Sequence, residues 1–134
     1  MSERLARGLL DTSVVVDLNQ FTADQLPVEI AISAITLAEL SAGPMATNDH
    51  AERARRQDRL QRIEAAFDPL PFGVNAARAY GLVHAAVVER GRQPTRRFAD
   101  LLIASIAVAE QLPLLTRNAD LFLGLDQLIS VVVV

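Results

Sequence analysis

The sequence predicts an α/β fold in which a parallel sheet is covered by helices. Short apolar runs typical of buried strands alternate with longer stretches whose apolar residues recur at helical spacing. Strands separated by helices are joined by crossovers, which favour parallel pairing and a sheet buried on both faces. The 134 residues contain no linker, repeat or low-complexity segment, so we expect one domain over residues 1–134.

The predicted elements follow one another along the whole chain. In order they are a strand at residues 8–11, a strand at 28–34, a helix that begins at Ser33 or Thr36 and ends at Gly43, helices at 49–67, 74–91 and 96–111, a strand at 112–118, a helical turn at 119–122 and a strand at 128–134. Two segments stay open. Residues 18–27 fit a loop or a short helix, and residues 67–73, with two prolines, fit an edge strand or a loop.

Composition excludes several kinds of site. The chain has no cysteine, which excludes disulfides, thiolate zinc sites and thiol nucleophiles. All 13 basic residues are arginine, so the lysine of a P-loop or of a Schiff base is absent. The two histidines, His50 and His84, lie far apart without a metal-binding spacing. The functional groups that remain for binding or catalysis are carboxylates, hydroxyls and guanidinium groups.

Charge and hydropathy constrain partners and location. The net charge of −3 argues against binding nucleic acid by bulk attraction. No apolar stretch reaches the roughly 18 uncharged residues of a membrane span, and the apolar run near the N-terminus is too short for a secretory signal. We therefore expect a cytoplasmic protein with no membrane partner.

Four carboxylates stand where the predicted strands end or where the neighbouring helices begin: Asp11, Glu39, Asp100 and Asp120. Ligands of open parallel sheets bind beyond the carboxyl ends of the strands. Like charges gathered in one crevice raise one another's pKa, and a divalent cation removes that cost. Oxygen ligands suit Mg²⁺ or Mn²⁺, which can activate water for hydrolysis of a phosphodiester.

Each acid also has a local structural explanation. Asp11, Thr12 or Ser13 suits the N-cap of the helix that follows. Glu39 follows Thr36 at capping-box spacing, Asp100 follows Arg96 and Arg97 at ion-pair spacing, and Asp120 suits the start of a turn. The explanation for Glu39 fails if Ser33 is the true cap. Four other acids, Asp17, Asp24, Asp58 and Asp126, are expected to be solvated. No single acid is decisive, but the order of the four along the chain is informative.

Three segments carry a likeness to a known family: LLDTSVVVD, ISAITLAEL and FADLLIASIAVAEQLPLLTRN. In this order and spacing they resemble the PIN-domain nucleases, and among these most the VapC-type toxins of bacterial toxin–antitoxin pairs. The likeness spans essentially the entire chain. It implies a PIN-like three-layer sandwich with a central parallel sheet flanked by helices. It also implies a metal-dependent endoribonuclease that holds Mg²⁺ or Mn²⁺ in an acidic cluster and cleaves RNA with a metal-activated water.

The resemblance assigns roles to particular side chains. Asp11 and Asp100 would be the principal metal ligands, and Glu39 and Asp120 would be further catalytic acids. Asp120 stands one residue earlier than the fourth acid of many related toxins, so Asn118 could take its place. The supporting polar positions are Thr12, Ser13, Thr116 and Asn118.

An acidic site needs positive charge nearby to hold RNA. The expected contacts to the RNA backbone are Arg92, Arg96, Arg97 and Arg117, because arginine–phosphate contacts position a nucleic acid. The arginines at residues 53–62 alternate with acids, which favours a solvated, salt-bridged face there. Phe21 and Phe98 are candidates for base stacking.

The family resemblance also implies protein partners. Similar toxins form homodimers and are neutralised by an antitoxin whose C-terminal segment covers the nuclease groove. The small residues of the helix at 74–91 fit a dimer interface or ordinary packing equally well. Two other functions stay open: a housekeeping PIN nuclease in RNA maturation, and a non-catalytic α/β dimerisation or binding module in which the acids are only caps.

Overall fold

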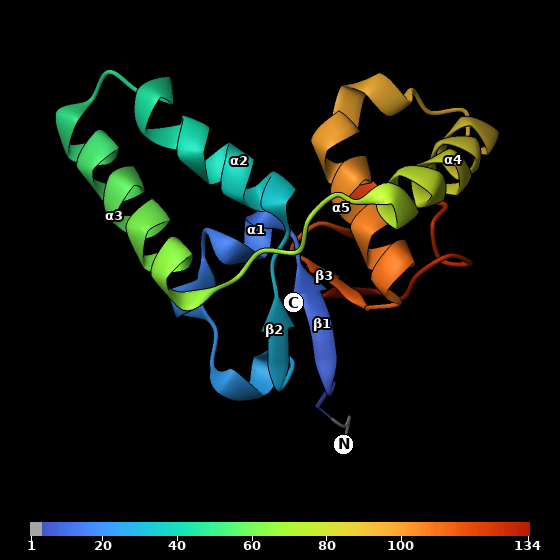
Figure 1. Cartoon of the computed structure of the whole chain (residues 1–134), viewed down its shortest axis with the longest axis horizontal. Helices are drawn as coiled ribbons and strands as arrows, with labels where there is room; N and C mark the ends of the chain where they lie inside the picture. The colour runs from blue at the N-terminus through green and yellow to red at the C-terminus, as the bar shows by residue number, and fades with distance from the viewer. Residues whose placement is uncertain (1–3) are drawn as a thin grey trace.

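The computed structural model describes residues 4–134 and contains one four-stranded sheet (Figure 1). The strands lie in the order β2 (Glu29–Ala31), β1 (Arg7–Leu10), β3 (Leu114–Thr116) and β4 (Val131–Val133). Each neighbouring pair is parallel, which confirms the prediction from the alternation of strands and helices. The carboxyl ends of β1, β2 and β3 therefore meet at one edge of the sheet.

Helices lie on both sides of the sheet, as the three-layer prediction requires. The hairpin of α2 (Ala34–Ala42) and α3 (His50–Ala66) lies on one side, and α4 (Val74–Glu89) and α5 (Phe98–Glu110) lie together on the other (Figure 1). The short helix α1 (Thr12–Val15) follows β1 directly. No helix within residues 4–134 has the length and apolar character that crossing a membrane requires.

Neighbouring leucines of the central strands fill two separate cores. Leu9 and Leu114 pack with residues of α4 and α5, whereas Leu10 and Leu115 pack with residues of α1, α2 and α3. All four side chains are at most 1% exposed. Because successive side chains of a strand point to opposite faces, a continuous apolar run is what a sheet covered on both faces needs.

The two segments left open by the sequence are now defined. Residues 18–27 contain two single-turn 3-10 helices, η1 (Leu18–Gln20) and η2 (Ala23–Gln25). Residues 67–73 form a loop with one isolated bridge between Leu70 and Ser33, not a strand. Further 3-10 turns are η3 (Gly43–Ala46), η4 (Pro94–Arg97) and η5 (Ala119–Phe122), and η5 is the predicted helical turn.

The first turn of α2 resolves the capping question. The Ser33 hydroxyl accepts a hydrogen bond from the Thr36 N–H at 3.0 Å, so Ser33 is the N-cap. Glu39 lies six residues beyond this cap and has no part in a capping box. The local structural explanation of Glu39 is therefore wrong, and its carboxylate is available to the site described below.

The close approach of β1 to its neighbours requires a glycine at position 8. A Cβ added there would lie 2.6 Å from the Leu115 Cδ1 and 2.7 Å from the Pro27 Cγ. The proline ring is rigid and Leu115 is buried, so neither can move away cheaply. We expect Gly8→Ala to lower the free energy of unfolding by about 1–3 kcal/mol in urea denaturation.

Gly81 provides the matched control for this substitution. It lies within α4, and an added Cβ would meet nothing within 4 Å. Gly81→Ala is expected to raise the free energy of unfolding by about 0.5–1 kcal/mol, because alanine favours a helix interior. Equal effects of the two substitutions would contradict the packing argument for position 8.

Candidate active site

Asp11 immediately follows β1 at the carboxyl edge of the sheet and is 1% exposed. Its Oδ1 accepts hydrogen bonds from the Ser13 hydroxyl at 2.6 Å and from the Val14 N–H at 3.3 Å. The N-cap role is thus present, but it uses one carboxylate oxygen only. Within residues 4–134 the other oxygen, Oδ2, is buried and has no hydrogen-bond partner. An unpaired buried carboxylate oxygen is costly, and a cation would satisfy it.

A row of hydroxyl groups holds Glu39 at the same edge. The Thr12 Oγ1 donates to the Glu39 Oε1 at 2.6 Å and lies 2.9 Å from the Thr36 Oγ1. Ser33 Oγ donates to the Thr36 Oγ1 at 3.3 Å. Since each hydroxyl has a single proton, the direction of donation runs from Ser33 through Thr36 and Thr12 to the carboxylate. This row orients the side chain of Glu39, a residue on the surface of α2.

Asp100 lies in the first turn of α5 and is partly buried. Burial, and then the negative charges of Glu39 and Asp11, raise the pKa of Asp100 from 3.8 to about 6. The Arg97 guanidinium opposes this shift with a smaller effect. Glu39 and Asp11, distant from Asp100 in sequence, therefore lie within electrostatic reach of Asp100.

The chemistry of these acids fits a divalent cation of the Mg²⁺ type. A cation would provide the missing partner of the Asp11 Oδ2 and would offset the crowding of charge that raises the pKa of Asp100. In the part of the chain that the structure describes, no three or more acidic or histidine side chains are placed so that together they could cage a metal ion. Mg²⁺ needs no such cage, because it keeps several waters and uses one or two carboxylates. Asp11 and Asp100 are the residues that could hold it.

The loop after β3 is joined to the Asp11 loop. The Arg117 N–H donates to the Ser13 hydroxyl at 3.1 Å, and Ser13 in turn donates to Asp11. The Thr116 Oγ1 accepts from the Asn118 N–H, and the Asn118 Oδ1 accepts from the Asp120 N–H, each at 3.1 Å. Thr116 and Asn118 therefore shape this loop and cap η5, which is a supporting role.

Two of the expected charged residues have partners that the sequence did not indicate. The Arg117 guanidinium donates to the Asp17 carboxylate at 2.6 Å and lies over the Phe21 ring, 5.1 Å from its centroid. The expectation that Asp17 is merely solvated is therefore wrong. Asp120 is paired with Arg92 and Arg97 and is absent from the charges that shift the pKa of Asp100.

Comparison with known proteins identifies the family. The family model of the PIN domain matches residues 8–126. The chain belongs to the PIN-domain family. It is 34% identical to Ribonuclease VapC5 of Mycobacterium tuberculosis over 137 aligned residues, which cover 100% of this chain and 98% of that protein. It is 36% identical to Ribonuclease VapC8 of the same species over 105 residues, 75% of this chain and 89% of that protein.

The PIN domain also matches solved structures. One is the crystal structure of VapBC-5, a member of the VapBC family of toxin–antitoxin systems from Mycobacterium tuberculosis. It matches with a TM-score of 0.84 and 34% sequence identity, covering 96% of this chain and 99% of the matched chain. Another is FitAcB from Neisseria gonorrhoeae, with a TM-score of 0.68 and 26% identity, covering 92% of this chain and 95% of the matched chain.

Sequence reasoning overlooked one element of the PIN-domain site, the buried hydroxyl of Thr36. Thr36 is fully buried and lies between Ser33 and Thr12 in the row of hydroxyls. The sequence had suggested it only as a helix start. A usable signal was its spacing, because residues three apart in a helix share a face and Glu39 is three residues after Thr36.

Proposed function

We propose that this PIN domain is a metal-dependent endoribonuclease of the VapC type and acts as the toxin of a toxin–antitoxin pair. The observation that carries the proposal is the buried Oδ2 of Asp11, which has no hydrogen-bond partner in residues 4–134. It is supported by the hydrogen bond that holds Glu39 to the neighbouring Thr12, and by the raised pKa of Asp100, to which the charges of Glu39 and Asp11 contribute. The relative matched over the full chain is named a ribonuclease, and the similar solved structure is that of a toxin–antitoxin system.

The chain's own residues would divide the work of hydrolysis. When bound, Mg²⁺ or Mn²⁺ supplies charge stabilisation on the phosphate and a lower pKa for water. Asp11, oriented by Ser13, and Asp100 would hold the ion. Glu39 is fixed through its Oε1 by Thr12, so its Oε2 can accept the proton of the attacking water. Asp120 or Asn118 would complete the site from the β3 loop.

The proposal includes partners and a location. The substrate would be RNA and the inhibitor would be an antitoxin protein. The PIN domain would meet both in the cytoplasm. A homodimer fits the surface of α4, where Leu82 is 57% exposed and Val88 is 52% exposed. The backbone of RNA would meet the arginines beside η5, of which Arg96 lines the same cleft as Arg92 and Arg97.

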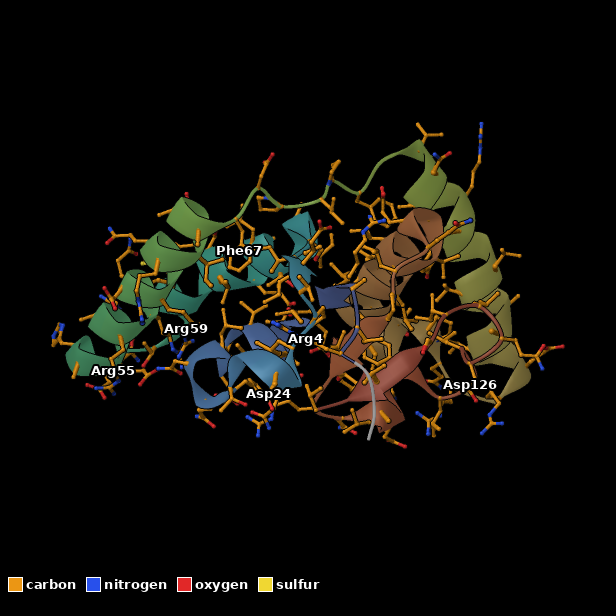
Figure 2. All side chains as sticks on the ribbon, turned by 90° about the horizontal axis from the view of Figure 1, so that it is seen from below. Arg4, Asp24, Arg55, Arg59, Phe67 and Asp126 are labelled. Atoms are coloured by element: carbon orange, nitrogen blue, oxygen red, sulfur yellow. The ribbon has the colours of Figure 1, made fainter. Side chains whose placement is uncertain are left out.

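Cleavage of labelled single-stranded RNA tests the nuclease proposal. We expect the purified protein to cut RNA with Mg²⁺ or Mn²⁺ and to stop when EDTA is added. Asp11→Asn should lower the rate at least about 100-fold, because it removes a metal ligand. Asp126→Asn, a change at an exposed acid (Figure 2), should leave the rate within about twofold of the native value. Cleavage that persists in EDTA would refute a metal-dependent mechanism.

Expression in cells separates the toxin from the other functions. A toxin should arrest growth, and co-expression of its antitoxin should restore growth. RNA cleavage without growth arrest would favour a housekeeping nuclease. Absence of both cleavage and a metal-induced rise in melting temperature would favour a non-catalytic binding module.

A further inference from the structure

Two arginines converge on a single acid beside the candidate active site. The Arg92 guanidinium donates to the Asp120 carboxylate at 3.2 Å, and a nitrogen of Arg97 lies 3.5 Å from the other carboxylate oxygen. Both arginines also donate to the backbone carbonyl of Asp120, at 2.9 Å and 3.0 Å. Arg92 lies just before η4 and Arg97 ends it, whereas Asp120 lies in η5. Arg97 and Arg92 are 23 and 28 residues from Asp120 in the chain.

The surroundings offer more space than one carboxylate fills. Arg92, Arg96 and Arg97 line a surface cleft of about 400 Å³ whose apolar wall includes Leu101 and Leu121. This volume is in the range of small-molecule sites. All three arginines line this one cleft. In residues 4–134 Arg92 and Arg97 form ion pairs with Asp120 alone, and Arg96 forms none.

The cleft adjoins the acidic site. Arg97, which precedes Asp100 by three residues, and Leu101, which directly follows Asp100 in α5, both line the cleft. A group bound between Arg92 and Arg97 would therefore lie next to the predicted metal ligands. That position suits a phosphate adjacent to the bond to be cut.

We propose that Arg92 and Arg97 form a phosphodiester-binding clamp for RNA, and that the Asp120 carboxylate occupies this clamp in the free protein as an internal substitute for phosphate. The inference rests on the proposed ribonuclease function. A carboxylate and a phosphodiester each carry one negative charge and present two oxygens to the forked guanidinium group. RNA would displace the carboxylate, while the Asp120 carbonyl would keep both guanidinium groups oriented.

Displacement of the Asp120 carboxylate by a phosphate of RNA would also change the role of Asp120. In the free protein the Asp120 carboxylate competes with RNA for Arg92 and Arg97, so it lowers the affinity for RNA. When a phosphate takes its place, the carboxylate is released at the edge of the site that contains Asp100. Asp120 would then be a positioning residue that couples RNA binding to completion of the acidic cluster.

Binding of fluorescein-labelled single-stranded RNA, followed by anisotropy in EDTA, tests the clamp without cleavage. Arg92→Gln and Arg97→Gln should each weaken binding at least about threefold and reduce the slope of log affinity against log salt by about 0.7. Asp120→Asn should have the opposite effect and strengthen binding roughly two- to fivefold, because it removes the competing charge. If Asp120 served catalysis alone, Asp120→Asn would leave the affinity for RNA unchanged.

Two controls make these results specific. Arg7 is a matched arginine because it also pairs with an acid, Glu29 at 3.6 Å, but at the amino end of β1. Arg7→Gln should change the affinity less than either clamp variant. Arg92→Lys and Arg97→Lys retain charge but lose the fork, so they should keep the salt slope and still bind more weakly than the native chain.

Several outcomes would overturn the clamp. These are unchanged or weaker binding by Asp120→Asn, equal losses for Arg7→Gln and the clamp variants, and no RNA binding by the native chain. If oligoglutamate competed with RNA for the native chain at equal total charge, the ligand of the clamp would be an acidic protein partner and not RNA. Failure of the ribonuclease proposal looks different: RNA would bind through Arg92 and Arg97 in EDTA, yet stay uncut when Mg²⁺ or Mn²⁺ is added.

Discussion

Asp100→Asn should abolish metal-dependent cleavage of RNA and, at the same time, stabilise the metal-free protein at neutral pH. The first effect follows from loss of a proposed metal ligand and should exceed about 100-fold in rate. The second follows from charge. Burial and the neighbouring charges of Glu39 and Asp11 make ionised Asp100 unfavourable in the folded state, and asparagine keeps the shape without the charge.

The pH dependence of stability gives the sign of the second effect. The folded-state pKa of Asp100 is about 6, above the 3.8 of an unperturbed aspartate, so the folded protein binds its proton more tightly than the unfolded chain does. Between these two values the free energy of unfolding falls as the pH rises, and the full penalty is present above pH 6. Allowing for solvent contact, we expect about 1–2 kcal/mol at pH 7.5, or about 3–8 °C in melting temperature.

Thermal melts at several pH values, with and without Mg²⁺, measure this effect. The advantage of Asp100→Asn should shrink as the pH falls and approach zero near pH 3, below both pKa values, where native Asp100 is protonated in both states. Added Mg²⁺ should raise the melting temperature of the native chain more than that of the variant. Asp58→Asn serves as the control, because Asp58 is 66% exposed in a surface ion pair with Arg62. A variant that melts below the native protein at pH 7.5 would contradict the charge argument.

Phe122→Ala should lower the free energy of unfolding by about 3–5 kcal/mol, the largest stability change expected for this chain. Phe122 is 1% exposed and is among the largest fully buried side chains of the protein. It lies in η5 and packs in the core shared by β1, β3, α4 and α5. Truncation would leave a cavity beneath the turn that presents Asp120.

Chemical denaturation tests the role of Phe122. Phe98→Ala is the matched control, because Phe98 is 50% exposed and its ring meets Tyr80 edge-on at 5.8 Å. The control should cost about 1 kcal/mol or less. Phe122→Leu should recover most of the lost stability by refilling the cavity. Equal costs for both alanine variants would show that η5 is not anchored by this side chain.

The acids of the candidate site and the packed core make opposite contributions to the stability of the fold. Leu9, Leu10, Leu114 and Phe122 stabilise the fold by burial. By contrast, Asp11 has a buried oxygen without a partner, and burial and neighbouring charges raise the pKa of Asp100. Functional sites commonly reduce stability in this way, because the groups that bind a ligand are left unsatisfied without it. The two predictions above measure the two sides of this balance.

The orientation of the individual hydrogen bonds could not be predicted from sequence. Whether Ser33 or Thr36 caps α2 depends on the backbone angles where β2 turns into the helix, and both residues satisfy the composition rule. The pairing of Arg117 with Asp17 joins residues 100 positions apart, and that of Arg92 with Asp120 joins residues 28 apart. Such contacts depend on the packing of loops against one another, for which local spacing carries no signal.

The sequence by itself determined the four longer helices, the existence of the four strands and the positions of the acids along the chain, because side-chain periodicity and strand ends are local properties. Only the tertiary structure decided that Asp100 shares an electrostatic environment with Glu39 and Asp11, and that Asp120 lies between two arginines. The physical reason is distance in three dimensions. Coulomb interactions and desolvation depend on separation in space and not on separation along the chain, so they are set by the packing of α2, α5 and η5 around the sheet.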